Sequence, residues 1–324
     1  MRIRPFPQSF RLPFDWTPPH ISRQTKDQAA ARSLLLLSTF PVILIGLIFI
    51  ALWLRARPIL AANSLSDLLL GETWKPLKGL FGFYPFITGT IWVTVAALVL
   101  AVPPCLLSAI YLAEYARPVT RALTKPLLDL LAAIPSVVYG VWGMVVIVPW
   151  VQKTIAPWIG KRLAFVPFLQ ANNPTGFSVL SGGIVLAVMI APFVIAVSYE
   201  VLQTVPAGVK EVSLAVGATR WQTVRYAILP HTLSGLTAAV VLGASRALGE
   251  TMAVLMVVGN VAQTPSSIFD PAYPLPALIA NNFGEMMSIP LYDSALMGAA
   301  LLLLAIVLVF NLGSMLVLRK VVKR

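Results

Sequence analysis

The most regular feature of the chain is a series of six long apolar stretches separated by more polar segments. The first runs from Leu34 to Leu54 without a formal charge, and a helix of about 20 such residues spans the hydrocarbon layer of a bilayer. Five further stretches are long enough to cross, and they cover residues 86–113, 127–151, 180–202, 232–258 and 291–318. The pattern predicts an all-α integral membrane protein, with a bundle of six transmembrane helices over residues 34–322.

Residues 1–33 are polar, contain several prolines and show no sustained apolar period, which predicts an irregular N-terminal tail. The alternative for this end of the chain is a cleaved signal peptide. Its apolar region would be about 7–15 residues long and would follow a short basic start. The stretch from Leu34 is longer and begins later, so we expect it to remain as a transmembrane helix.

Proline and small residues within the stretches predict how the helices pack. The prolines are Pro103, Pro104, Pro135 and Pro192. Neighbouring transmembrane helices satisfy backbone groups that a proline frees, so kinks are expected. The small residues that would let helices approach closely are Gly140, Gly143, Gly243 and Ala244.

Composition excludes several classes of protein. The chain is 58% hydrophobic and 11% charged, whereas soluble domains are about 45–50% apolar and about 25% charged. Disordered chains are poor in large apolar residues. One cysteine excludes a disulfide framework, and with two histidines neither a metal site nor any other cofactor is expected.

The net charge is +12, from 24 basic and 12 acidic residues. Such an excess is typical either of nucleic-acid binding or of the cytoplasmic flank of a membrane protein. Most of the basic residues lie in segments that face the cytoplasm if the N-terminus does, and residues 259–290 contain none. This distribution predicts that both termini lie in the cytoplasm and that a lipid bilayer surrounds the chain. Because the sequence has no basic-aromatic stripe, we expect no nucleic-acid partner.

The segments expected outside are long. Aromatic residues in 55–85 and 152–179 favour ordered caps or short surface helices. In 259–290, the apolar run from Leu278 to Met287 predicts a helix lying at the outer surface. Ser267, in the same segment, is expected to be accessible from outside.

The cytoplasmic segment 204–230, called here the coupling segment, has helical periodicity. Apolar positions share a face in each half: Val209, Val212 and Val216, then Trp221, Val224 and Ile228. Pro206 suits the first position of a helix, Gly217 breaks the run, and Pro230 is expected to end the second helix. Two short amphipathic helices parallel to the membrane are predicted. They would form either a protein contact or a linker resting on lipid headgroups.

The fifth stretch carries a charge of each sign inside the membrane. Arg246 and Glu250 are four residues apart, so a continuous helix would place them on one face. An intramembrane charge is costly and is by default a functional hypothesis. A guanidinium matches the oxygens of an anionic oxyacid, and Glu250 would hold Arg246 in the absence of substrate. The alternative is a structural ion pair.

Other polar residues in or next to the stretches are candidates for lining a path. They are Ser136, Tyr139, Thr251 and Asn260. Buried polar side chains also form hydrogen bonds within a bundle. Both alternatives, lining a path and bonding within the bundle, therefore stay open for these residues.

The coupling segment resembles a known signature. Prokaryotic ABC importer permeases carry Glu-Ala-Ala, three residues, Gly, nine residues, Ile, any residue and Leu-Pro. The matching positions here are Glu211, Ser213, Gly217, Leu229 and Pro230. Val212 and Ser213 stand in place of the two alanines, and Ala227 in place of the isoleucine. The resemblance implies that this segment, with Trp221, docks into a separate ATPase subunit. The chain itself has no phosphate-binding loop of the Gly-x-x-x-x-Gly-Lys-Ser/Thr type, so it is not expected to be an enzyme.

Two further segments, residues 134–143 and 245–254, resemble PstC-type permeases of phosphate ABC importers, with the related PstA type as the neighbouring possibility. The resemblance covers roughly residues 34–322. It implies a type I importer permease in the cytoplasmic (inner) membrane, with Arg246 and Glu250 involved in moving phosphate. The implied partners are a PstA-type permease, two PstB-type ATPase subunits and a PstS-type phosphate-binding protein.

Three other functions compete with this one. The first is an ABC permease for sulfate, molybdate or phosphonate, since Arg246 would serve any oxyanion. The second is a membrane scaffold that transports nothing. The third is a proton-coupled secondary transporter that uses Glu250, against which the coupling segment argues.

Overall fold

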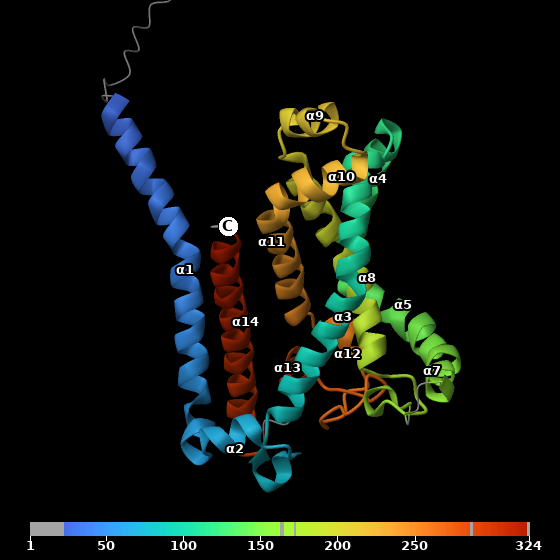
Figure 1. Ribbon diagram of the computed structural model, residues 1–324. Helices are drawn as coiled ribbons and strands as arrows, with labels where there is room; N and C mark the ends of the chain where they lie inside the picture. The colour runs from blue at the N-terminus through green and yellow to red at the C-terminus, as the bar shows by residue number, and fades with distance from the viewer. Residues whose placement is uncertain (1–22, 163–164, 172, 286–287, 323–324) are drawn as a thin grey trace, which may run out of the picture. The chain divides into compact units, whose positions relative to one another are not determined.

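A computed structural model describes residues 23–162, 165–171, 173–285 and 288–322 (Figure 1). The chain divides into two units, with the boundary after Ala51. The described part of the first unit is the N-terminal portion of α1 (Arg23–Ala62). Helix therefore covers residues 23–33, where the sequence predicted an irregular tail, because the Gln, Lys, Arg and Ala residues there favour helix. The rest of that predicted tail lies outside the described residues.

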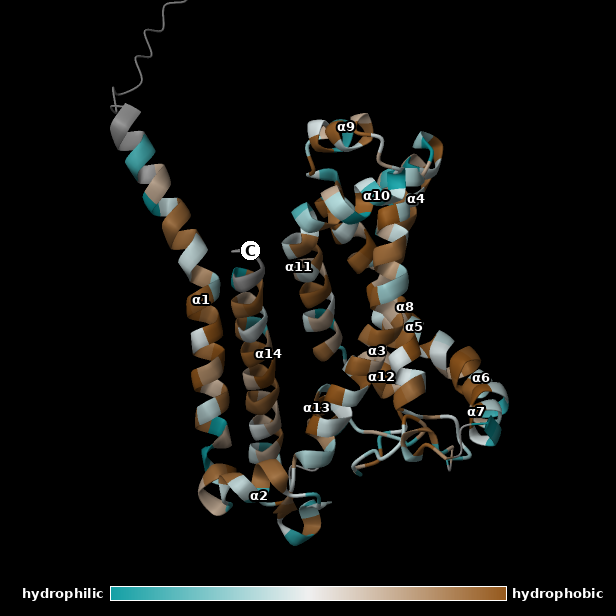
Figure 2. Ribbon diagram, viewed as in Figure 1, coloured by the Kyte–Doolittle hydropathy of each residue, from teal (hydrophilic) through white to brown (hydrophobic). Residues whose placement is uncertain are grey.

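Among the described residues, six helical segments are long and apolar enough to cross a membrane, in agreement with the predicted number. They are Ala30–Ala62, Tyr84–Tyr115, Ser136–Arg162, Val179–Gln203, Arg220–Leu248 and Tyr292–Arg319. Figure 2 shows the apolar colouring along much of α1 and of α14 (Tyr292–Val322). The described strands form one small antiparallel hairpin, β1 (Trp74–Lys75) with β2 (Leu80–Phe81).

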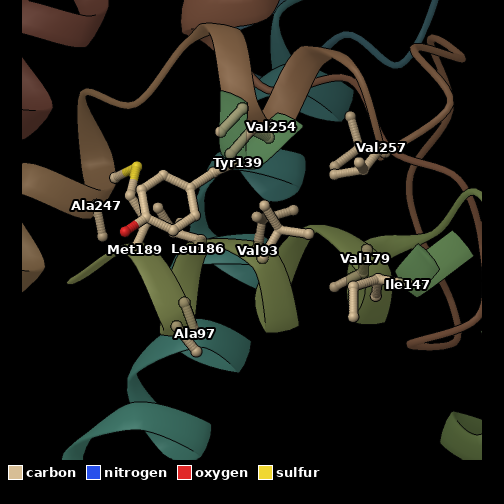
Figure 3. Packing of buried hydrophobic residues seen from close by; sticks show 14 of the residues in the cluster. Val93, Ala97, Tyr139, Ile147, Val179, Leu186, Met189, Ala247, Val254 and Val257 are labelled. Atoms are coloured by element: carbon tan, nitrogen blue, oxygen red, sulfur yellow. The ribbon is translucent and has the colours of Figure 1, made fainter. Parts of the chain in front are cut away.

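The main core of the second unit is built around α3 (Tyr84–Ile110) and α8 (Val179–Gln203), which pack extensively on each other. In lipid, helix association depends on close packing of small residues. A Cβ built on Gly183 of α8 would lie 2.7 Å from the Cβ of Ala96 on α3. Around this contact, valines, leucines and alanines from several helices form the cluster in Figure 3. The prolines inside α3 and α8 do not interrupt them.

The third predicted span, residues 127–151, is wrong at both ends. A separate helix, α4 (Pro118–Ala133), ends before Pro135, and α5 (Ser136–Trp142) starts after it. Proline disfavours helical backbone at the preceding residue, and Ile134 is extended, with φ −63° and ψ 129°. Beyond α5 the helix continues to Arg162 through four further pieces: η3 (Gly143–Ile147), α6 (Val148–Trp150), η4 (Val151–Ile155) and α7 (Ala156–Arg162).

The fifth predicted span, residues 232–258, is also wrong in its extent. Helix runs without a break from Arg220 through three pieces: α10 (Arg220–Thr223), the π-turn η6 (Val224–Ile228) and α11 (Leu229–Leu248). Pro230 therefore does not end a helix. It directly follows the π-turn, where the regular i→i−4 hydrogen bonding of the α-helix is already interrupted. The helix ends instead at Leu248, and α12 (Met252–Leu255) is a separate short turn.

The short helices that follow the two breaks, α5 and α12, pack against each other. Gly140 of α5 faces α12, and a Cβ at this glycine would meet the Met256 sulfur at 2.7 Å and the Ala253 Cα at 3.1 Å. Gly243 of α11 is equally crowded, since a Cβ there would lie 2.6 Å from a methyl group of Val194 on α8. These glycines permit the close approach that the sequence predicted.

Segments between the spans form a second core. Trp74 packs against Phe81, Phe83 and Phe86 in edge-on or tilted contacts with ring centroids 5.0–5.9 Å apart, beside α2 (Leu65–Leu70) and η1 (Pro76–Lys78). This agrees with the ordered cap predicted for residues 55–85. The segment 152–179 contains η5 (Pro167–Leu169) in addition to the end of the helix at Arg162.

The predicted outer-surface helix from Leu278 to Met287 is wrong in place and in burial. The helix is α13 (Leu275–Asn282), and its first residues are buried in the second core. Met287 lies outside the described residues. Ser267 is also buried, because its hydroxyl donates to the carbonyl oxygens of Phe168, at 3.0 Å, and Gln170, at 2.8 Å. It is therefore not the accessible position that the sequence suggested.

Candidate coupling surface and substrate path

The coupling segment contains one short helix and the start of a long one, joined at a glycine, so the joint is as predicted but the second helix is not short. The first is α9 (Ala207–Ala215), preceded by Pro206, and the second begins with α10. Gly217 has φ +86°, a left-handed conformation that glycine adopts without steric cost. Thr219 starts α10 with a capping box, in which its hydroxyl accepts from the Gln222 N–H and the Gln222 side chain accepts from the Thr219 N–H.

The outer face of this helix pair is apolar and uncovered. Val216 is 80% exposed and Trp221 is 50% exposed, with Val212 also on the surface. Val209, predicted on the same face, instead packs partly into a small core beneath the helix. Glu211 is exposed beside the apolar residues. The segment therefore presents apolar side chains outward, with one acidic group among them.

Two signature residues hold the segment together from within. The Ser213 hydroxyl lies 3.0 Å from the Thr223 hydroxyl and ties α9 to α10. Leu229 packs partly into the core that contains Val209, whereas Pro230 is exposed. The signature therefore divides into outward positions (Glu211, Gly217 and Pro230) and inward ones.

Sequence reasoning missed an ion pair that connects this segment to the bundle. Lys210 Nζ on α9 lies 2.7 Å from Glu114 Oε1, in the π-turn η2 (Tyr111–Tyr115) that continues α3. A signal was present in the sequence, because Glu114 is an isolated acid directly after the apolar stretch 86–113. Nothing in the spacing of the two residues indicates the pairing.

Arg246 and Glu250 do not form the predicted pair. Arg246 lies in the last turn of α11, and the helix ends before Glu250. The ion pairs between described residues are Lys125–Glu200 and Lys210–Glu114. The prediction assumed a continuous helix, whereas Gly249 lowers helix propensity at the point where α11 ends. Glu250 Oε1 instead accepts from the Ala253 N–H at 3.2 Å and fixes the start of α12.

The Arg246 side chain is exposed on the surface of the isolated chain. Its guanidinium carbon lies 5.8 Å from the centre of the Phe193 ring on α8. The adjacent Ser245 donates to the side-chain oxygen of Asn311 at 2.8 Å, well inside α14. Arg246 is therefore level with the interior of the candidate span of α14, where a charge that faces lipid is costly.

The remaining candidate path residues are only partly gathered around Arg246. Tyr139 is packed near the arginine's neighbour in sequence, since Figure 3 shows its ring beside Ala247 and Met189. The Tyr139 hydroxyl donates to the Leu131 carbonyl of α4 at 2.8 Å. Ser136 is the first residue of α5, at the break that follows Pro135.

Two other candidates stabilise the backbone after α11. The Thr251 hydroxyl donates to the Gly249 carbonyl at 3.3 Å. Asn260 has φ 52° and donates to the Leu255 carbonyl at 2.7 Å. These contacts give both residues a structural role, and their place on a path stays a prediction. Among the described residues, no cluster of three or more His, Cys, Asp or Glu side chains could hold a metal ion.

Comparison with known proteins identifies the family. Residues 105–324 match the family described as "Binding-protein-dependent transport system inner membrane component". The chain belongs to this family. It is 39% identical over 260 residues to the phosphate transport system permease protein PstC of Haemophilus influenzae, covering 78% of this chain and 80% of that one. It is 35% identical over 269 residues to PstC of Mesorhizobium japonicum, covering 82% and 81%.

A solved structure supports the fold independently. The chain superposes with a TM-score of 0.55, at 17% identity, on a chain of a bacterial ABC transporter involved in the import of the acidic polysaccharide alginate, covering 92% of this chain and 99% of that one. Together with the family match, this confirms an all-α ABC importer permease, a multi-pass inner-membrane protein of the PstC group. The chain is a membrane component of a transport system and not an enzyme.

Proposed function

We propose that this chain is the PstC-type permease subunit of an ATP-driven importer and moves inorganic phosphate across the cytoplasmic membrane. The observation that carries the proposal is the exposed apolar helix pair of the coupling segment, with Glu211 and Gly217 at the spacing of ABC importer permeases. PstC relatives at 35–39% identity support phosphate as the substrate.

The partners follow from this role. An ATPase subunit docks on the surface formed by Val212, Val216 and Trp221, which is uncovered in this chain. A PstA-type permease completes the membrane part, two PstB-type ATPase subunits bind below, and a PstS-type protein delivers phosphate from outside. Closure of the ATPase pair on ATP moves the coupling segments, and the bundle opens outward to receive phosphate.

Arg246 is the group of this chain that meets phosphate on the path. Its side chain is exposed, is level with the interior of the candidate span of α14, and forms no ion pair with Glu250. Guanidinium groups bind phosphate oxygens through two parallel hydrogen bonds. Glu250 contributes by fixing the backbone between α11 and α12 next to the arginine. The chain supplies a path and a switch, with no covalent chemistry.

Uptake of labelled phosphate into vesicles that contain the complete complex tests this function. We expect uptake that requires ATP and the ATPase subunits and that excess sulfate does not suppress. Uptake without the ATPase would indicate a secondary transporter, and preference for sulfate would indicate a different oxyanion permease. An assembled complex that carries neither anion would indicate a scaffold.

Both termini are proposed to be cytoplasmic, because basic residues are absent from 259–290 and abundant in the opposite segments. A Ser266→Cys variant tests this orientation, since Ser266 is exposed whereas Ser267 and the native Cys105 are buried. We expect a membrane-impermeant thiol reagent to label Ser266→Cys in intact cells and to leave Ser267→Cys unlabelled. Labelling of Ser266→Cys only after permeabilisation would invert the orientation.

A further inference from the structure

The π-turn η2, at the end of α3, is held from two sides by polar contacts. From the coupling segment, Lys210 Nζ reaches Glu114 Oε1 at 2.7 Å. From α4, the Arg121 guanidinium donates to the Ala113 carbonyl at 2.8 Å. The adjacent residues 113 and 114 therefore connect the coupling helix α9 with α4.

Burial distinguishes this ion pair from the other one described. The side chains of Lys210 and Glu114 are 25% and 14% exposed, whereas those of Lys125 and Glu200 are 64% and 59% exposed. Exposed ion pairs contribute little, because water and salt screen them. Removing one partner from a largely buried pair leaves an uncompensated charge, which is strongly unfavourable. The Lys210–Glu114 link is thus the more consequential of the two.

From α4 the contacts continue to the candidate substrate path. The Leu131 carbonyl, near the end of α4, accepts from the Tyr139 hydroxyl of α5, and Tyr139 belongs to the same buried cluster as Ala247, the residue after Arg246 (Figure 3). A displacement of α9 is therefore connected to the surroundings of Arg246 through packed elements and hydrogen bonds. Such connectivity permits coupling between sites and requires a coupling measurement to establish it.

We propose that Glu114 and Lys210 are positioning residues that transmit movement of the coupling helix to α3 and α4. This inference rests on the proposed function, in which an ATPase docks on α9. Two further contacts hold α9 in place without the ion pair: the Ser213–Thr223 hydrogen bond and the packing of Val209. Loss of the pair is therefore expected to leave the docking surface formed and to impair transmission.

The test uses the complete complex in liposomes and measures three quantities: phosphate uptake, ATP hydrolysis, and retention of the ATPase subunit during purification. The variants are Lys210→Met, Glu114→Gln, the exchange Lys210→Glu with Glu114→Lys, and the conservative Lys210→Arg. Lys125→Met is the matched control, because it breaks the exposed ion pair on α4.

For the two single neutral variants, we expect phosphate transported per ATP hydrolysed to fall about tenfold, within the range of coupling between sites. The ATPase subunit should remain bound. The charge exchange and Lys210→Arg should restore most of the lost coupling, and Lys125→Met should resemble the unaltered protein. A pair that only stabilised the fold would lower the amount of assembled complex and leave the coupling ratio unchanged.

Three outcomes would overturn the proposal. They are an unchanged coupling ratio in both single variants, loss of the ATPase subunit from them, and an exchange variant that assembles but stays uncoupled. Failure of the proposed function gives a different result, because the unaltered complex would then show no ATP-dependent phosphate uptake.

Discussion

The contact between the coupling segment and the bundle and the candidate substrate path each contain one basic and one acidic residue, but the two pairs are arranged differently. Glu114 and Lys210 come from distant parts of the chain and meet at 2.7 Å in a largely buried site. Arg246 and Glu250 are neighbours in sequence, yet one lies in the last turn of α11 and the other fixes the start of α12. The first set forms an ion pair, to which we assign the transmission of movement. The second forms no ion pair among the described residues, which in the proposed function leaves Arg246 free to bind an anion.

The largest effect that this comparison predicts is at Arg246. We expect Arg246→Gln to lower phosphate uptake roughly 10- to 100-fold, because a hydrogen bond to a charged group contributes about 1.5–3 kcal/mol and about 1.4 kcal/mol is a factor of ten. Arg246→Lys should retain an intermediate rate, since it keeps the charge but not the two-pronged geometry. The measurement is uptake by equal amounts of assembled complex. Loss of assembly in Arg246→Gln would instead favour a structural role.

A smaller effect is expected where the two helix interruptions meet. Gly140→Val places methyl groups against Met256 and Ala253, and such overpacking costs about 1–3 kcal/mol. Gly208→Val is the control, because no atom lies within 4 Å of a Cβ at that position. Thermal unfolding of the purified complex should show a lower midpoint for Gly140→Val only. Equal midpoints would mean that α5 and α12 are not closely packed.

The smallest effect concerns the role of Glu250. Glu250→Gln keeps an oxygen that can accept from the Ala253 N–H, whereas Glu250→Ala removes it, and loss of a helix-capping contact costs about 0.5–2 kcal/mol. We therefore expect Glu250→Ala to reduce uptake more than Glu250→Gln does. If both variants lose uptake as fully as Arg246→Gln, the carboxylate charge itself is required and the two residues act together during transport.

Local patterns predicted part of this molecule well. The six apolar stretches follow from hydropathy, and the joint at Gly217 follows from the backbone freedom of glycine. The glycine contacts between helices follow from side-chain size. The sequence gives all three properties directly. The breaks at Pro135 and Gly249 were harder to predict. Pro103, Pro104 and Pro192 sit inside intact helices, so only tertiary packing decides which proline or glycine ends a helix.

The candidate site was predicted in its residues but not in its geometry. The spacing of Arg246 and Glu250 indicates a pair only if the helix between them is continuous, and it ends at Leu248. Conversely, Glu114 and Lys210 are far apart in sequence, and no periodicity relates one to the other. Long-range pairing of this kind depends on how α9 lies against the π-turn η2 that follows α3, which the sequence alone does not specify.

The most direct test of the central claim is the ratio of phosphate imported to ATP hydrolysed in the complete complex, compared between Gly217→Pro and Gly208→Ala. Proline at position 217 cannot adopt φ +86° and removes the N–H that donates to Leu214, so the outward face of the coupling segment is distorted. Alanine at 208, inside α9, is compatible with helix. The account predicts that Gly217→Pro uncouples hydrolysis from uptake while Gly208→Ala transports normally. Normal transport by Gly217→Pro would contradict it.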